Sequence, residues 1–272
     1  MGGEAMAEKV TVPEILKMKR AGRKIAVLTA YDYSFARILD DAGIDILLVG
    51  DSVGSVVQGQ ESTLPVTLEE MIYHTRIVAR GRKRALLVAD MPFLSYQVSV
   101  EEAKRNAGRF LSEGGAEAVK VEGGVPVQKT IQAIVEMGIP VMGHVGLTPQ
   151  SIHRFGGYKV QGKEKEAREK IMRDALAVEE SGAFSIVLEG IPLDLAEEIT
   201  RRLSIPTIGI GAGIHCDGQV LVVHDMLGLF DAYTPKFVKQ YVDLKSVMAD
   251  AVKRFIAEVR EGTFPDDEHS FH

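Results

Sequence analysis

The sequence predicts an α/β protein, a (β/α)8 TIM barrel that spans residues 1–272 as a single domain. Short apolar runs rich in β-branched residues recur eight times, helical segments separate them, and each run ends in glycine or a polar residue. Continuous apolar strands that alternate with helices are typical of a parallel sheet covered by helices, and eight such units favour a closed barrel. The length of 272 residues suits one barrel. A doubly wound open sheet is the alternative fold.

The first predicted element is a helix that begins at the sequence Thr-Val-Pro-Glu, from Thr11. Because this helix precedes the first strand, we expect it to close the bottom of the barrel by burying Ile15 and Leu16. The predicted strands then follow, at 25–31, 44–51, 85–90, 118–124, 140–146, 184–190, 205–213 and 219–225.

The helices between the strands carry their own start and stop signals. The segments from Thr67 to Glu70 and from Ser99 to Glu102 match the capping box, in which a hydroxyl and a carboxylate satisfy each other's backbone amides. Glycines fall where a helix must end before a strand, at Gly43, Gly114, Gly115 and Gly182. The chain from Thr234 to Glu261 predicts one or two closing helices.

Two segments leave alternatives open. Residues 213–218 are too few for a full crossover between the last two strands. Either the seventh helix is vestigial, or the segment 219–230 is itself helical. The glycine-bracketed segment from Gly156 to Gly162 follows the fifth strand and is either a mobile lid or a long turn.

Composition excludes several classes of protein. The formal net charge of −6, from 32 Lys and Arg against 38 Asp and Glu, provides no basic surface for nucleic acid. No apolar run approaches the roughly 18 residues of a membrane span, and the N-terminus lacks the apolar segment of a signal peptide. The single cysteine, Cys216, excludes an internal disulfide and a thiolate metal cluster. We therefore expect a soluble, cytoplasmic protein in a reducing compartment, with no nucleic-acid or membrane partner.

Polar residues end the predicted strands, which is where barrel enzymes place their reacting groups. Lys120 and Glu122 are two residues apart, so their side chains lie on one face of their strand. Charged groups inside an apolar strand are costly unless they are paired or bind a ligand. The strand ends supply the candidate site residues Asp51, Ser52, Asp90, Lys120, Glu122, His144 and Glu189.

Four carboxylates that converge at one barrel mouth repel one another. A hard divalent cation relieves this repulsion, because Mg²⁺ accepts one or two protein carboxylates together with water and substrate oxygens. The pattern therefore predicts Mg²⁺ or Mn²⁺. Taken alone, Asp51 or Asp90 is explained equally well as a helix N-cap. His144 is a second candidate for catalysis, and its alternative is a buried histidine bonded to a backbone carbonyl.

Nine long motifs, spread over nearly the whole chain, also match one known family. They are TAYDYSFA (29–36), LLVGDSVG (47–54), TLPVTLEEMIYHT (63–75), LLVADMPF (86–93), VKVEGG (119–124), GHVGLTPQS (143–151), FGGYKVQG (155–162), GIGAG (209–213) and DEHSFH (267–272). In these motifs the sequence closely resembles ketopantoate hydroxymethyltransferases. The resemblance implies a barrel of the phosphoenolpyruvate/pyruvate type.

The resemblance also implies roles for individual residues. The family's Mg²⁺ ligands fall on Asp51, Asp90 and Glu122. Its 2-oxoacid contacts fall on Asp51, Ser52, Asp90 and Lys120, and its proton acceptor falls on Glu189. All of these positions follow the family pattern.

The family transfers a hydroxymethyl group from 5,10-methylenetetrahydrofolate to 3-methyl-2-oxobutanoate through a Mg²⁺-stabilised enolate. The product is 2-dehydropantoate, in pantothenate and coenzyme A biosynthesis. The implied partners are thus a small 2-oxoacid, a folate and further copies of the chain, since the family commonly forms decamers built from pentameric rings. Two alternatives remain: a lyase or mutase of the same barrel superfamily without a folate site, and a non-catalytic barrel that binds a 2-oxoacid or a metal.

Overall fold

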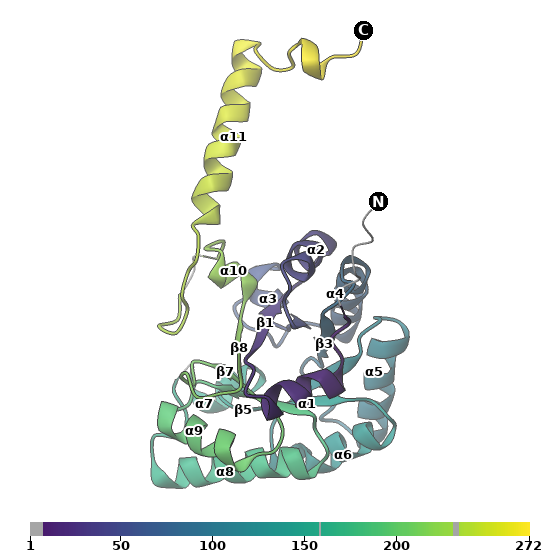
Figure 1. The fold of residues 1–272 in the computed structure, drawn as a ribbon, viewed down its shortest axis with the longest axis vertical. Helices are drawn as coiled ribbons and strands as arrows, with labels where there is room; N and C mark the ends of the chain where they lie inside the picture. Colours follow the sequence, from purple (N-terminus) through teal and green to yellow (C-terminus); the bar gives the residue numbers. More distant parts are fainter. Residues whose placement is uncertain (1–7, 158, 231–233) are drawn as a thin grey trace. The chain divides into compact units, whose positions relative to one another are not determined.

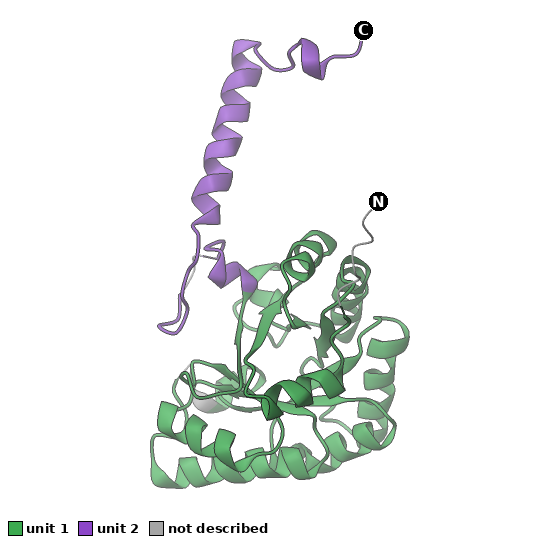
Figure 2. Ribbon diagram, viewed as in Figure 1, with its two compact units in different colours: residues 1–222 green, residues 223–272 purple. Residues whose placement is uncertain are grey.

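The computed structural model describes residues 8–157, 159–230 and 234–272, in two compact units of residues 1–222 and 223–272 (Figure 2). In the first unit, eight parallel strands close into a barrel in the order of the sequence, and the last strand pairs with the first. The predicted barrel is therefore confirmed. The strands are β1 (Ile25–Thr29), β2 (Ile46–Val49), β3 (Leu86–Asp90), β4 (Ala118–Glu122), β5 (Val141–Gly146), β6 (Ser185–Glu189), β7 (Thr207–Ile210) and β8 (Gly218–Leu221).

Helices follow most of the strands and cover the outside of the barrel (Figure 1). This arrangement arises because each parallel strand needs a crossover to reach the next one. The helices of the first unit are α1 (Val12–Arg20), α2 (Tyr33–Asp41), α3 (Val53–Val56), α4 (Leu68–Gly81), α5 (Val100–Ser112), α6 (Gln128–Glu136), α7 (Ile152–Phe155), α8 (Lys165–Glu180) and α9 (Leu193–Arg202), with short 3-10 turns η1 (Val125–Val127) and η2 (Pro149–Ser151).

The open question about the last strand has a mixed answer. The predicted strand at 219–225 is too long, because β8 ends at Leu221 and the short helix α10 (Val223–Met226) follows. The described chain between β7 and β8 contains no helix, so the seventh crossover is a loop. In the second unit, the predicted closing segment forms one helix, α11 (Leu244–Glu261), followed by the 3-10 turn η3 (Asp267–His269).

The helix signals are only partly correct. The capping box at Thr67 is complete at the start of α4, whereas Ser99 at the start of α5 accepts from the Glu102 N–H and, among the described residues, receives no return bond from the Glu102 side chain. Gly115 has φ of 74°, as a residue that ends a helix in the left-handed region requires, but Gly114 does not. Tyr158, inside the predicted lid or turn, lies outside the described residues.

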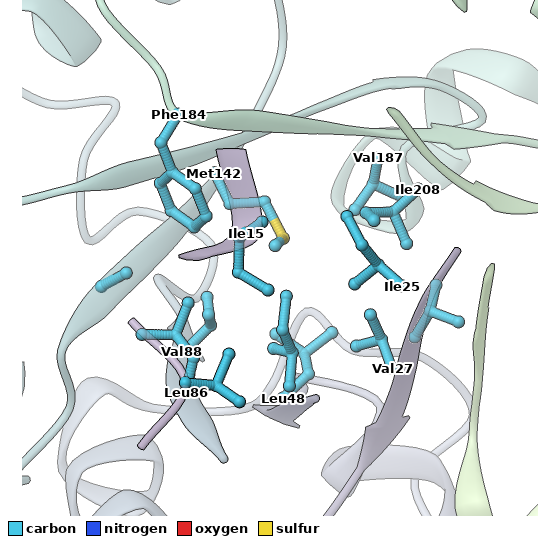
Figure 3. Close-up of a cluster of buried hydrophobic side chains, with 14 of the residues drawn as sticks. Ile15, Ile25, Val27, Leu48, Leu86, Val88, Met142, Phe184, Val187 and Ile208 are labelled. Carbon is cyan, nitrogen blue, oxygen red and sulfur yellow. The ribbon is translucent and has the colours of Figure 1, made fainter. Parts of the chain in front are cut away.

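An apolar cluster fills the bottom of the barrel (Figure 3). Alternate residues of each strand point inward, and at the bottom these are aliphatic, for example Val27, Leu48 and Val88. Helix α1 closes this end with Ile15 and Met18, which are fully buried. The predicted role of α1 is correct, but Met18 takes the place expected for Leu16, which is only half-buried.

Among the described residues, no helix combines the length and apolar character required to cross a lipid bilayer.

Candidate active site at the carboxyl ends of the strands

The inward-facing positions change from apolar to charged along each strand. On β4, Ala118 belongs to the apolar cluster, and Lys120 and Glu122 follow on the same face. On β3, Asp90 follows Val88 in the same way. The period of two residues along a strand therefore carries the charged side chains into the upper barrel, directly above a dry core.

Three carboxylates meet there almost out of contact with water. Asp51, just after β2, is 4% exposed, Asp90 is 3% exposed and Glu122 is 7% exposed. The Asp51 backbone N–H donates to Asp90 Oδ2 over 3.1 Å. Burial, followed by the negative charges of Asp90 and Glu122, raises the pKa of Asp51 to about 8. Burial and the neighbouring acids thus disfavour a negative charge on Asp51 when no cation is bound.

Lys120 is the cation closest to these acids. Its Nζ lies 2.9 Å from Oδ1 of Asp90 and 3.4 Å from Nδ1 of His144. Burial opposes the charge on Lys120, but Asp90, Glu122 and Asp51 outweigh this effect and hold its pKa above the ordinary value. Lys120 is thus a charged ammonium inside the barrel.

His144 lies between two glutamates. Its Nδ1 is 3.3 Å from Oε1 of Glu122, and its Nε2 is 3.1 Å from Oε2 of Glu189. Burial and the charge of Lys120 lower the pKa of His144, but the two glutamates prevail and raise it to about 9. In the described part of the chain, neither ring nitrogen of His144 bonds to a backbone carbonyl. The alternative of a buried histidine held by such a carbonyl is therefore not supported.

Glu189, at the end of β6, is the most accessible acid of the group, with 15% of its side chain exposed. The ends of β5 and β6 approach closely beside it. Gly146 has φ of 98°, and a Cβ at that position would lie 2.3 Å from the Glu189 carbonyl oxygen. Only glycine fits this contact, which helps to place Glu189 beside His144.

Ser52 lies at the edge of the acid cluster, and its Oγ is 2.8 Å from the hydroxyl of Tyr31. It occupies the N-cap position of α3 without making a side-chain capping bond. The Asp90 side chain accepts from the Asp51 backbone N–H at the end of the neighbouring strand, and the Asp51 side chain accepts from the Gln150 amide. Neither of these bonds is made to the first turn of a helix. Their side chains therefore do not act as N-caps.

Two residues that sequence reasoning did not single out connect the acids. The Gln150 side-chain amide donates to Asp51 Oδ2 over 2.9 Å and to the Met91 carbonyl, and its backbone N–H donates to Glu122 Oε2. The Tyr96 hydroxyl donates to Gln150 Oε1 over 2.7 Å. Both residues lie in loops that follow strands, so the rule that functional groups gather at this end of a barrel was the available signal.

The site suits a hard divalent cation that brings several ligands of its own. Among the described residues, no group of three or more His, Cys, Asp or Glu side chains forms a ready metal cage. Mg²⁺ needs only one or two protein carboxylates, because water and substrate oxygens complete its octahedron. The buried, mutually repelling Asp51 and Asp90 could provide those carboxylates, and a cation between them would relieve their repulsion.

Comparison with known proteins supports one family. A model of the ketopantoate hydroxymethyltransferase family matches residues 9–267. The 3-methyl-2-oxobutanoate hydroxymethyltransferase of Geobacter metallireducens is 63% identical over 266 residues, which cover 98% of this chain and all of the relative.

Solved structures support the fold alone. A phosphonopyruvate hydrolase, solved with oxalate and Mg²⁺, has a TM-score of 0.63 at 12% identity and covers 95% of this chain and 92% of its own. A 2,3-dimethylmalate lyase of the PEP mutase/isocitrate lyase superfamily has a TM-score of 0.58 at 16% identity, with 96% and 91% covered.

Proposed function

The chain belongs to the ketopantoate hydroxymethyltransferase family, and we propose that it transfers a hydroxymethyl group from 5,10-methylenetetrahydrofolate to 3-methyl-2-oxobutanoate, forming 2-dehydropantoate for pantothenate biosynthesis. The observation that carries the proposal is the buried group of Asp51, Asp90, Lys120 and Glu122 with Glu189 at its accessible side. It combines acids for a cation, a positive charge for an anionic substrate and a base.

Asp51 and Asp90 would hold Mg²⁺, with Glu122 beside them. When bound, Mg²⁺ supplies Lewis-acid stabilisation for the negative charge that develops on the substrate's keto oxygen. Lys120 and Ser52 bind the oxoacid, because an ammonium and a hydroxyl both donate hydrogen bonds to carboxylate and keto oxygens.

Glu189 takes the C3 proton of the oxoacid. Its side chain is the most exposed of the four acids. Its Oε2 contacts His144 Nε2, whereas Lys120 is paired with Asp90. The resulting C3 carbanion forms a bond to the methylene carbon of the folate. Both carbon–nitrogen bonds of the methylene bridge, to N5 and to N10, break. One water supplies the hydroxyl group, and the C3 proton and the second water proton end on the two nitrogens of tetrahydrofolate. His144 positions Glu189 through its Nε2 and contacts Glu122 through its Nδ1, so it links the two glutamates.

A lyase or mutase of the same superfamily is the competing enzyme, because it would use the same acids. Identity separates the two: 63% to the hydroxymethyltransferase of Geobacter metallireducens against 16% or less to the hydrolase and the lyase described above. The N-cap explanation, on which a non-catalytic barrel would depend, is not supported by the bonds of Asp51 and Asp90.

The proposal includes assembly into a homo-oligomer, as large as a decamer, in the cytoplasm. Helix α11 supports self-association, because six exposed apolar residues follow one another at helical spacing along one of its faces: Val247, Met248, Val252, Phe255, Ile256 and Val259. A second copy of this chain is the partner we propose for that face.

A product assay tests the proposed function. Purified protein with Mg²⁺, 3-methyl-2-oxobutanoate and methylenetetrahydrofolate should form 2-dehydropantoate, and omission of the folate should abolish the product. A lyase or mutase would instead consume the oxoacid without folate. A binding barrel would bind the oxoacid in a calorimetric titration and convert none of it.

A further inference from the structure

A cavity of about 310 Å³ opens beside the acid cluster. Its walls come from the loops after β3, β4 and β5 and from the first turns of α8. Val145 lines the cavity from the outer side of β5, and Glu122, whose side chain contacts the inward-facing His144, lines it from β4. The cavity therefore extends from the helices to the edge of the acid cluster. An oxoacid bound at the inward-facing acids therefore leaves this space available.

The cavity and the acid cluster share one wall. Glu122, Gln150 and Tyr96 line the cavity. The same Glu122 and Gln150 bond to each other, and Gln150 bonds to Asp51. A molecule in the cavity would thus border the acid cluster at Glu122 and Gln150.

The lining combines apolar side chains with polar groups that can still form hydrogen bonds. Phe93, Val127 and Ile171 provide the apolar surface. The Thr148 hydroxyl has no hydrogen-bond partner in the described chain although the residue is only 7% exposed. The Gln161 amide donates to the Lys159 carbonyl, which leaves its oxygen as an acceptor. A planar heteroaromatic ring with an amide-like edge has the complementary chemistry.

The rim adds positive charge. Arg154 lines the cavity, is exposed and forms no ion pair with any described residue. Lys170, also at the rim, is paired with Asp174. An unpaired guanidinium at the opening favours a ligand whose ring enters the cavity and whose carboxylates remain outside.

We propose that this cavity seats the pterin ring of the folate co-substrate, with the glutamate tail extending toward Arg154. The inference rests on the proposed function and adds the location of the second substrate. It places the folate beside Glu122 and Gln150, which line the cavity and also contact the acid cluster.

Ala167→Phe tests the inference, because Ala167 lines the cavity from α8 and a benzyl group would fill it. Two readouts are required: the KM for methylenetetrahydrofolate, and the exchange of the C3 proton of 3-methyl-2-oxobutanoate with D₂O, which needs no folate. We expect the KM to rise at least tenfold while exchange stays within twofold of wild type. Arg173→Phe, which adds the same side chain on α8 outside the cavity, is the matched control and should change neither.

The tail is tested separately by titration with tetrahydrofolate and with a tetrahydropterin that lacks the glutamate. Arg154→Ala should weaken tetrahydrofolate binding about twofold to fivefold and leave the tetrahydropterin unchanged. Arg173→Ala is the control for loss of an exposed arginine.

The outcomes separate failure of the proposed function from failure of the cavity assignment. Wild-type protein without exchange and without transfer contradicts the proposed function. Wild-type kinetics in Ala167→Phe contradict the cavity assignment alone. If Ala167→Phe fails to fold, Thr148→Val removes the unpartnered hydroxyl with little change in shape, and unchanged tetrahydrofolate affinity in both Thr148→Val and Arg154→Ala overturns the inference.

Discussion

Lys120 carries its charge in a place that excludes water, so its neighbours decide what it does. Its partner is Asp90, at 2.9 Å, rather than Glu122, which shares its strand face. A buried ion pair is costly to break from one side, because the remaining charge is left uncompensated. A divalent cation near Asp90 would take over part of that compensation and leave the ammonium available to a substrate carboxylate.

We therefore expect Lys120→Ala to weaken 2-oxoacid binding at least tenfold in the presence of Mg²⁺, with a smaller loss of stability than in metal-free buffer. Isothermal titration and thermal melts with and without Mg²⁺ measure the two effects. Unchanged oxoacid affinity together with lower thermal stability would make Lys120 a purely structural partner of Asp90.

Glu189→Gln keeps the shape of the side chain and deletes its basicity. Because Glu189 is the proposed base, C3 proton exchange should fall by about 10²-fold or more while Mg²⁺ and oxoacid still bind. His144→Asn should reduce exchange less, since His144 contacts the base and not the substrate in this account. If His144→Asn abolishes exchange and Glu189→Gln retains it, His144 is the base.

With Asp51 as a proposed Mg²⁺ ligand, metal binding should depend on pH. In the metal-free protein its pKa is raised to about 8 by burial and by Asp90 and Glu122, with Lys120 acting in the opposite direction. The folded state therefore holds a proton there that Mg²⁺ must displace, and affinity for Mg²⁺ should fall as pH falls below 8, by up to about tenfold per unit. Calorimetry at pH 6, 7 and 8 measures this trend. Equal affinity across that range would show that Asp51 is ionised without metal.

At the scale of single elements, helix α1 closes the bottom of the barrel. Ile15 and Met18 are three residues apart, so they lie on one face of the helix, whereas Leu16 is rotated about 100° away. The same spacing, applied to the sequence, would have identified Met18 as the buried partner.

Ile15→Ala should lower the free energy of unfolding by about 2–5 kcal/mol, because the side chain is fully buried among strand residues and leaves a cavity. Leu16→Ala, at a half-buried position of the same helix, is the control and should cost clearly less. Urea unfolding measures both. Equal losses would mean that α1 does not plug the barrel through its Ile15 face.

The strand ends also show why some site residues could be predicted and others could not. Asp90, Lys120 and Glu122 follow from the regular alternation of strand residues, which fixes where a side chain points. Gln150 lies in η2, after β5, where no period applies, and its bonds to Asp51 and Glu122 arise from tertiary structure. Its position in a motif, GLTPQS, marked the segment without indicating the role of the side chain.

At the scale of the whole molecule, the eight strands and their closure were predictable because apolar runs and crossovers alternate almost without interruption. The exception is the chain from Gly211 to Val223, where a loop replaces a helix and β8 gives way to α10. Too few residues separate β7 from β8 for a crossover helix to form. The length of this segment, rather than its composition, therefore explains why the helix is missing from the pattern. Helix α11 follows the last strand and is not part of the repeated strand–helix pattern. The pattern therefore predicts that a helix forms there but not what the helix does.

Self-association should depend on the apolar face of α11. The double variant Val252→Glu with Phe255→Glu places two charges on that face and should reduce the mass measured by size-exclusion chromatography with light scattering. Asp250→Lys changes charge on the opposite face of the helix and should leave the mass unchanged. An unaltered mass in the double variant would remove α11 from the interface.

The central claim is that this barrel uses a divalent cation and Glu189 to remove the C3 proton of a branched 2-oxoacid. The most direct measurement is NMR of 3-methyl-2-oxobutanoate in D₂O with wild-type protein and no folate. The account predicts loss of the C3 methine signal with Mg²⁺ and none after EDTA treatment, with recovery when Mg²⁺ is restored. Exchange at the same rate in metal-free buffer, or no exchange with saturating Mg²⁺ and oxoacid, would contradict it.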